Sequence, residues 1–274
     1  MTADAELMRL ELDNQVVAGR AFLVAEPAIA STYGTSAETV SGLTCTTCAA
    51  WEYPLFNRVI GAGVLAPLDE RGLDAIVTHY ASRGRVCNVE VYPDVTPPEV
   101  AALLARAGFA SSGHGLEAHV LETDRPVAPA GGGDAVRKIG PAEYRHFGEL
   151  VRDGFGMGGG GLLAEFFVDL TVASLRALGD RSAGFIASVD GTDAGTGQLV
   201  LSERVAGCYS GSVLEAFRGR GIQHALIAAR VAEGLRRGRR IFISQTDPDS
   251  PSGHNLHDLG FRTLYHATWH ARPA

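Results

Sequence analysis

The chain has 274 residues, of which 46% are hydrophobic and 20% charged, and its formal net charge is -7 at pH 7. At roughly 150 residues per domain, this length predicts one large or two ordinary domains, and the hydrophobic content excludes a disordered or collagen-like chain. The acidic balance argues against nucleic acid as a partner, because non-specific affinity for a phosphate backbone depends on many Lys and Arg contacts. No apolar run approaches the roughly 18 residues of a membrane span, and the opening MTADAELMRLELDNQ carries acids where a secretory signal carries basic residues. We therefore expect a membrane-free, cytoplasmic protein, and the abundance of Ala, Arg and Gly is typical of a GC-rich bacterial genome.

The first half of the chain contains four elements with clear periodicity. They are a helix with the apolar stripe Leu73, Ile76, Val77 and Tyr80, a strand at Val86–Tyr92, a helix at Pro97–Ala107 and a strand that opens at Gly108-Phe109.

Residues 125–134 are rich in Pro, Gly and Ala and have no periodicity, which is typical of a linker between domains. The sequence therefore predicts an N-terminal domain at 1–124 and a C-terminal domain at 135–274.

The second half reads as strand, two helices, three strands, helix, strand, helix and strand. The strands are predicted at Ala135–Ile139, Gly184–Val189, Gln198–Ser202, Ala206–Leu214, Ile241–Ser244 and Phe261–His270, and the helices at Pro141–Asp153, Leu162–Leu178, from Gly219 onward and at Ser252–Leu259. This order predicts an α+β fold, a mixed β-sheet flanked by helices.

The two halves repeat part of this order. Ile222 in the second apolar helix stripe lies 149 residues after Leu73, and Gly260 lies 152 residues after Gly108. We interpret the halves as two copies of one α+β unit.

The segment from Phe217 to Gln223, FRGRGIQ, stands between a predicted strand and a predicted helix. A helix N-terminus offers free N–H groups and about half a positive charge to a phosphate. Gly219 and Gly221 let the backbone approach a diphosphate closely, and the guanidinium of Arg218 adds several N–H donors. The segment therefore predicts a pyrophosphate site without the P-loop lysine, because Lys138 is the only lysine of the chain.

This segment resembles the acetyl-CoA signature [RQ]-x-x-G-x-[GA] of the GNAT N-acetyltransferase superfamily, with Gln223 in place of the final small residue. The order of elements from Ala135 to Ala274 is similar to a whole GNAT domain, and the first half is similar to a degenerate copy. The resemblance implies two tandem GNAT-like domains, acetyl-CoA as co-substrate and direct acetyl transfer to an amine. It implies CoA contacts at Ser212, Val213, Leu214, Arg218, Gly219, Arg220, Gly221, Ile222, Gln223, Ser252 and Asn255, with helix capping as an alternative for Ser252.

The resemblance also implies a tyrosine four residues before the Gly-Phe pair as general acid, but Leu256 occupies that position. The candidates to replace it, or to accept the amine proton, are Glu215, Tyr265, Tyr209 and His257, followed by His254 and Glu203. Each also has a structural interpretation, as a packed strand aromatic, a solvated strand end or an exposed helix face.

The turn of the first half that corresponds to the pyrophosphate site reads APLDERG from Ala66 to Gly72. Its proline removes one N–H and its two carboxylates repel phosphate, so we expect no CoA binding there.

Three other patterns receive structural interpretations. The sequence GMGGGG from Gly156 to Gly161 follows a helix and not a strand, so it is no dinucleotide site; it is either a linker or a loop beside the acceptor. Cys45 and Cys48 lack further metal ligands, so we predict ordinary thiols and no metal. The arginines at 236, 237, 239 and 240 complement a helix C-terminus.

The sequence thus predicts an N-acetyltransferase that acts on an unidentified, small-molecule amine. A non-catalytic CoA-binding or scaffold protein is the alternative, favoured by Leu256 and Gln223. Net charge and pattern leave the acceptor and the oligomeric state open.

Overall fold

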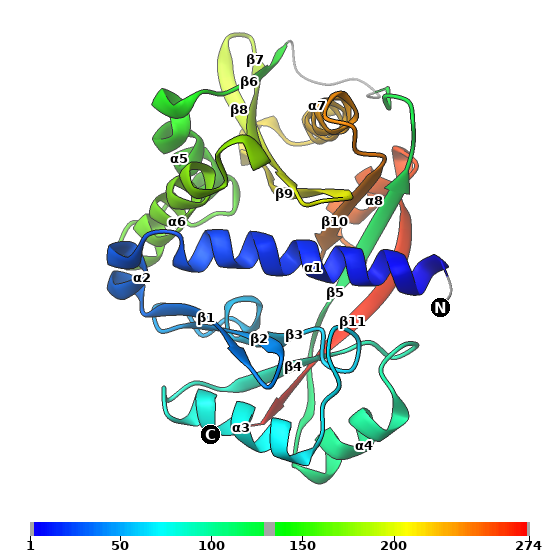
Figure 1. The fold of residues 1–274 in the computed structure, drawn as a ribbon. Helices are drawn as coiled ribbons and strands as arrows, with labels where there is room; N and C mark the ends of the chain where they lie inside the picture. The colour runs from blue at the N-terminus through cyan, green and yellow to red at the C-terminus, as the bar shows by residue number, and fades with distance from the viewer. Residues whose placement is uncertain (1–2, 129–134, 273–274) are drawn as a thin grey trace. The chain divides into compact units, whose positions relative to one another are not determined.

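A computed structural model describes residues 3–128 and 135–272 of the chain (Figure 1). They form two compact units: unit 1 is Met1–Glu117 with Leu264–Ala274, and unit 2 is Ala118–Thr263. The predicted division at 125–134 differs from this one, because the C-terminal strand belongs to unit 1 and the segment from Ala118 belongs to unit 2. Positions 129–134 of the predicted linker lie outside the described residues.

Unit 1 is a sheet with helices. Its elements are α1 (Ala3–Val24), α2 (Pro27–Tyr33), β1 (Thr35–Val40), β2 (Leu43–Cys48), the 3-10 turn η1 (Pro54–Phe56), β3 (Arg58–Ile60), α3 (Glu70–Ala81), β4 (Cys87–Val91), α4 (Pro98–Arg106), β5 (Ala110–Glu122) as far as Glu117 and β11 (Arg262–Arg272) from Leu264. The strand order is β1-β2-β3-β4-β11-β5. β3 and β4 run parallel, while β11 pairs antiparallel with β4, with Thr268 opposite Val91 and Arg272 opposite Cys87. This pairing explains why the C-terminal strand belongs to unit 1.

Helix α3 confirms the apolar stripe predicted in the first half. Its Leu73, Ile76 and Tyr80 are buried in one hydrophobic cluster with Val59 and Val89 of the sheet. The 3.6-residue period therefore identified the face that packs on the sheet.

Helix α1 was not predicted, although it is the longest helix described, with 22 residues. Its buried face includes Glu11, Asn14 and Gln15, at 0%, 0% and 3% exposure. Because polar residues occupy part of the buried face, the helix lacks the continuous apolar stripe from which an amphipathic helix is predicted.

Unit 2 contains the elements predicted for the second half except the last strand, which belongs to unit 1. They are the end of β5, β6 (Ala135–Lys138), the 3-10 turn η2 (Pro141–Glu143), α5 (Tyr144–Gly154), α6 (Leu162–Leu178), the 3-10 turn η3 (Gly179–Arg181), β7 (Ser182–Val189), β8 (Thr192–Leu201), β9 (Val205–Val213), the 3-10 turn η4 (Glu215–Phe217), α7 (Ile222–Arg236), β10 (Ile241–Thr246) and α8 (Pro251–Asp258). The strand order is β5-β10-β9-β8-β7-β6, with β9 and β10 parallel and β6 to β9 antiparallel. The predicted α+β class, a mixed sheet flanked by helices, is confirmed.

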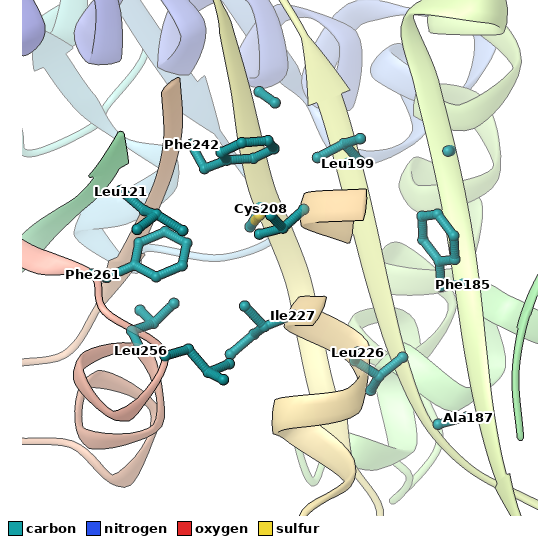
Figure 2. Close-up of a cluster of buried hydrophobic side chains, with 14 of the residues drawn as sticks. Leu121, Phe185, Ala187, Leu199, Cys208, Leu226, Ile227, Phe242, Leu256 and Phe261 are labelled. Carbon is teal, nitrogen blue, oxygen red and sulfur yellow. The ribbon is translucent and has the colours of Figure 1, made fainter. Parts of the chain in front are cut away.

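The core of unit 2 lies between helix α7 and the sheet (Figure 2). Leu226 and Ile227 of α7 are fully buried together with Leu199 of β8 and Phe242 of β10. At roughly 1.5–3 kcal/mol for each fully buried large apolar side chain, this packing fixes the position of α7 and therefore of its N-terminus.

Strand β9 separates from β10 before it ends. The parallel register between them runs from Val205 opposite Ile241 to Cys208 opposite Ser244, whereas β9 continues to Val213. On the other side, the register with β8 shifts between Thr196 and Gln198, and Ser210 has a φ of 48°. A bulge of this kind bends a strand and redirects its backbone groups. The last residues of β9 are therefore free of the β10 ladder on one edge.

Candidate functional site

A cavity of about 500 Å³ opens in unit 2 where β9 leaves β10. Its walls come from the C-terminal end of α5, the end of β9, the turn before α7 and the first turns of α7 and α8. The lining residues are Gly154, Phe155, Gly211, Ser212, Val213, Phe217, Arg218, Gly219, Gly221, Ile222, Gln223, His224, Pro251, Ser252 and Asn255.

Nine of the eleven residues predicted to bind CoA line this cavity. They are Ser212, Val213, Arg218, Gly219, Gly221, Ile222, Gln223, Ser252 and Asn255. The other two are not among the lining residues that the structure describes: the backbone N–H of Leu214 donates to the Ala194 carbonyl at 2.9 Å, and the Arg220 guanidinium lies 5.6 Å from the centre of the Phe217 ring.

The N-terminus of α7 faces the cavity through a turn that requires glycine. Gly219 and Gly221 have φ values of 77° and 74°, which L side chains rarely adopt, and a Cβ on Gly219 would meet no atom within 4 Å. Gly221 is the N-cap residue, and as a glycine it supplies no side-chain cap to the helix. The N–H groups of the first turn have no intrahelical acceptor, and the helix dipole adds positive potential there. The turn thus fits an anionic group such as a diphosphate.

Arg218 bonds to two carbonyls across the cavity. Its Nε donates to the Val213 carbonyl and its Nη2 to the Gly154 carbonyl, both at 3.3 Å. The guanidinium therefore connects the end of β9 to the end of α5, and it is exposed enough to turn toward an anion.

Six lining residues were not predicted: Gly154, Phe155, Gly211, Phe217, His224 and Pro251. A Cβ on Gly154 would lie 2.4 Å from Ser212 Oγ, so glycine is what lets α5 pack on β9 at this point. His224 follows directly on the predicted motif, in the first turn of α7, and its Nε2 lies 3.5 Å from Asp258 Oδ2. Extension of the motif by one residue would have found His224, whereas no local signal identifies the contribution of α5.

Arg230 lies on the α7 side of β9, beneath the bulge. It is 2% exposed, its Nε donates to the Leu226 carbonyl at 3.0 Å and its Nη1 donates to the Tyr209 carbonyl at 3.4 Å. Burial lowers the pKa of its guanidinium. The hydrogen bond fixes the orientation of the 209–210 peptide, because the peptide unit is planar.

None of the four predicted proton-transfer residues is among the described residues that line the cavity. Glu215 is exposed in η4, Tyr209 is half-buried on β9 and His257 is exposed on α8, with Nε2 3.1 Å from Thr263 Oγ1. Their roles stay predictions.

Tyr265 belongs to a polar network in the core of unit 1. The side chain is 6% exposed, and its hydroxyl donates to Glu11 and accepts from Gln15 Nε2 at 3.1 Å. Burial raises the pKa of Tyr265 well above its usual value. Arg58 extends the network by donating to Gln15 and to Glu90.

In unit 1, the turn before α3 corresponds to the turn before α7, and one of its own side chains caps the helix. Asp69 is the N-cap residue of α3, and its Oδ1 accepts from the Gly72 N–H at 2.7 Å. The N–H that a phosphate would use is thus already bonded.

The structure also gives the positions of the remaining sequence motifs. Cys45 and Cys48 are buried free thiols, and burial raises the pKa of Cys45 to about 12. Over residues 3–128 and 135–272, no three or more His, Cys, Asp or Glu side chains form a group that could hold a metal ion. Gly156–Gly161 follows α5 and precedes α6, so no strand leads into it. The helices of the described segments include none that is both long and apolar enough for a membrane span.

Comparison with known proteins gives a structural likeness only. No family model and no curated protein matches the chain. A GCN5-related N-acetyltransferase from Kribbella flavida is similar at a TM-score of 0.61 and 13% identity, over 88% of this chain and 90% of that one. A tandem GNAT protein from the clavulanic acid biosynthesis pathway is similar at a TM-score of 0.61 and 17% identity, over 84% and 78%. A GCN5-related N-acetyltransferase from Sphaerobacter thermophilus is similar at a TM-score of 0.57 and 15% identity, over 87% and 75%. The chain therefore has the fold of the GCN5-related N-acetyltransferases, in an arrangement of two tandem GNAT-like domains.

Proposed function

We propose that this chain is an N-acetyltransferase that transfers an acetyl group from acetyl-CoA to the amine of a small molecule. The observation that carries the proposal is the N-terminus of α7, where the N-cap residue Gly221 supplies no side-chain cap, at the wall of a cavity of about 500 Å³. Its first-turn N–H groups and the nearby Arg218 guanidinium are all donors, which suits the diphosphate of CoA.

The rest of the ligand would follow the end of β9. Ser212 and Val213 line the cavity beyond the last residue that pairs with β10, so this edge of the strand is open to a ligand in extended conformation. A backbone N–H of this segment would polarise the thioester carbonyl, as fixed donors do in acyl transfer generally.

The reaction needs one bond formed and one broken. The neutral amine nitrogen attacks the thioester carbonyl carbon, the new C–N bond forms, and the C–S bond breaks to release the CoA thiolate. One amine proton leaves to a base and one proton is delivered to the thiolate, so the products are an N-acetyl amide and the free thiol. Glu215, Tyr209 and His257 remain our candidates for these transfers, directly or through water.

The test is a calorimetric titration of acetyl-CoA into the wild type and Arg218→Glu. We expect saturable binding that weakens by about 100-fold in the variant, because a carboxylate replaces a donor beside the diphosphate. Arg181→Glu is the matched control, since it makes the same charge change at an exposed arginine of η3 that is not among the described residues lining the cavity. Absence of wild-type binding, or equal losses in the two variants, would contradict the proposal.

A second candidate is a CoA-binding protein without catalysis. It is favoured by Leu256, which is 2% exposed in the core of unit 2 and offers no proton. Release of free thiol from acetyl-CoA in the presence of a panel of amines separates the two candidates, because only an enzyme turns over.

A further inference from the structure

The side chain of Gln223 crosses the cavity from α7 to α8. Its Nε2 donates to Ser252 Oγ at 3.3 Å, and both residues line the cavity. Gln223 lies in the first turn of α7 and Ser252 in the first turn of α8, so one hydrogen bond joins two walls built from separate helices.

The same amide also lies over the third wall, β9. A Cβ on Gly211 would be 3.4 Å from Gln223 Nε2, and 3.5 Å from Nη1 and Nη2 of Arg230. Gly211 therefore leaves room for the amide at the point where β9 has separated from β10. The amide of Gln223, which belongs to α7, thus lies close to both α8 and β9.

A ligand that extends from the N-terminus of α7 through the cavity toward α8 would meet this amide, because Gln223 and Ser252 both line the cavity and are bonded to each other. To admit it, the Gln223 side chain has to leave Ser252 and rotate. The hydrogen bond that is lost is half-buried and is worth about 0.5–1.5 kcal/mol in typical proteins, or a factor of about 2–12 in affinity.

From this geometry we propose that Gln223 is a specificity-determining residue, a strap that a long ligand must displace and a short anion need not. A short anion, such as inorganic diphosphate, binds at Gly219, Gly221 and the first turn of α7 without reaching Gly211. Acetyl-CoA, which continues along β9, has to open the contact between Gln223 and Ser252. The inference rests on the proposed function, since it takes acetyl-CoA as the long ligand.

The experiment compares two ligands and four proteins by calorimetry. Acetyl-CoA and inorganic diphosphate are titrated into the wild type, Gln223→Ala, Ser252→Ala and the double variant. We expect Gln223→Ala to bind acetyl-CoA about 2- to 10-fold more tightly, with diphosphate affinity within about 2-fold of the wild type. Replacement of Ser252 should affect acetyl-CoA binding differently in the presence and absence of Gln223, because the two side chains are directly bonded.

One control and two contradicting outcomes keep the experiment unambiguous. Thermal unfolding without ligand checks that each variant is folded. Equal or weaker binding of acetyl-CoA to Gln223→Ala, with wild-type binding still lost in Arg218→Glu, would overturn the strap and leave the proposed function standing. Absence of acetyl-CoA binding in all four proteins would overturn both.

Discussion

The turns that precede α3 and α7 occupy corresponding places in the two units, yet they leave their helix N-termini in opposite states. In unit 1, Asp69 caps α3 by accepting from the Gly72 N–H. In unit 2, the N-cap residue of α7 is Gly221, which supplies no side-chain cap. One helix has a carboxylate cap at its N-terminus, and the other has a glycine in the same position.

Under the proposed function, this difference explains why the N-terminus of α7 and not that of α3 would serve as an anion site. Around α7, two glycines with positive φ and Arg218 replace the proline and the carboxylates of the first turn. The cavity beside α7 leaves room for an anionic ligand next to the N–H groups of its first turn. A carboxylate at the N-cap satisfies the donors and repels phosphate at once.

Gly221→Asp would place a carboxylate at the N-cap position of α7, where α3 has Asp69. Aspartate tolerates a positive φ better than most residues, so the turn can keep its shape. We expect acetyl-CoA affinity to fall by about 100-fold, because the new carboxylate repels the diphosphate.

Calorimetry measures that loss, and Gly221→Asn is the matched control. Asparagine adds a side chain of the same size without a charge and also tolerates a positive φ, so it should weaken binding less than aspartate does. Unchanged affinity in Gly221→Asp would mean that the anion does not bind at this helix N-terminus.

The opposite ends of the same helices offer a second contrast. The last turn of α3 has His79, which Arg83 contacts, whereas Glu233 near the end of α7 accepts from Lys138, Arg236 and Arg237. Burial by itself raises the pKa of Glu233, but these three hydrogen bonds outweigh it and lower the pKa from 4.5 to about 2.

A carboxyl whose pKa is lower in the folded state stabilises the fold above its unfolded pKa and loses that contribution as the pH falls toward the folded value. Glu233→Gln should therefore lower the free energy of unfolding by about 1–2 kcal/mol at pH 7, after allowance for the exposed cations. The difference from the wild type should shrink between pH 4.5 and about 2.

Urea unfolding across that pH range tests this expectation. Glu203→Gln, at an exposed glutamate outside the cluster, is the control and should give a small difference at every pH. A difference for Glu233→Gln that persists at the acid end would assign the effect to packing and not to charge.

The smallest expected effect comes from removing the cap of α3. Asp69→Ala should destabilise unit 1 by about 1 kcal/mol, because the Gly72 N–H loses its acceptor, and Asp69→Asn should retain most of the stability. Tryptophan fluorescence follows this unfolding selectively, since both tryptophans, Trp51 and Trp269, belong to unit 1. Acetyl-CoA affinity should stay unchanged, and a loss of binding would contradict the assignment of the site to α7.

Sequence patterns identified most of unit 2 because its elements are locally encoded. Leu162–Leu178 was predicted as a helix and α6 has the same bounds. The apolar stripe of α7 likewise predicted the face that packs on the sheet, with Ile222 and Leu226 buried. Helix α1 escaped prediction because Glu11 and Gln15 interrupt its apolar face, and their partner Tyr265 lies about 250 residues away in the chain.

The sequence by itself determined the turn from Arg218 to Gly221 and the helix that follows, since glycine conformation, helix initiation and apolar periodicity depend on neighbours a few residues apart. Only the tertiary structure decided what surrounds that turn. It brings Gly154 within hydrogen-bond reach of Arg218, 64 residues along the chain, and pairs Gln223 with Ser252. These contacts follow from the packing of α5, α7 and α8 around β9, and no local pattern encodes a distance between elements.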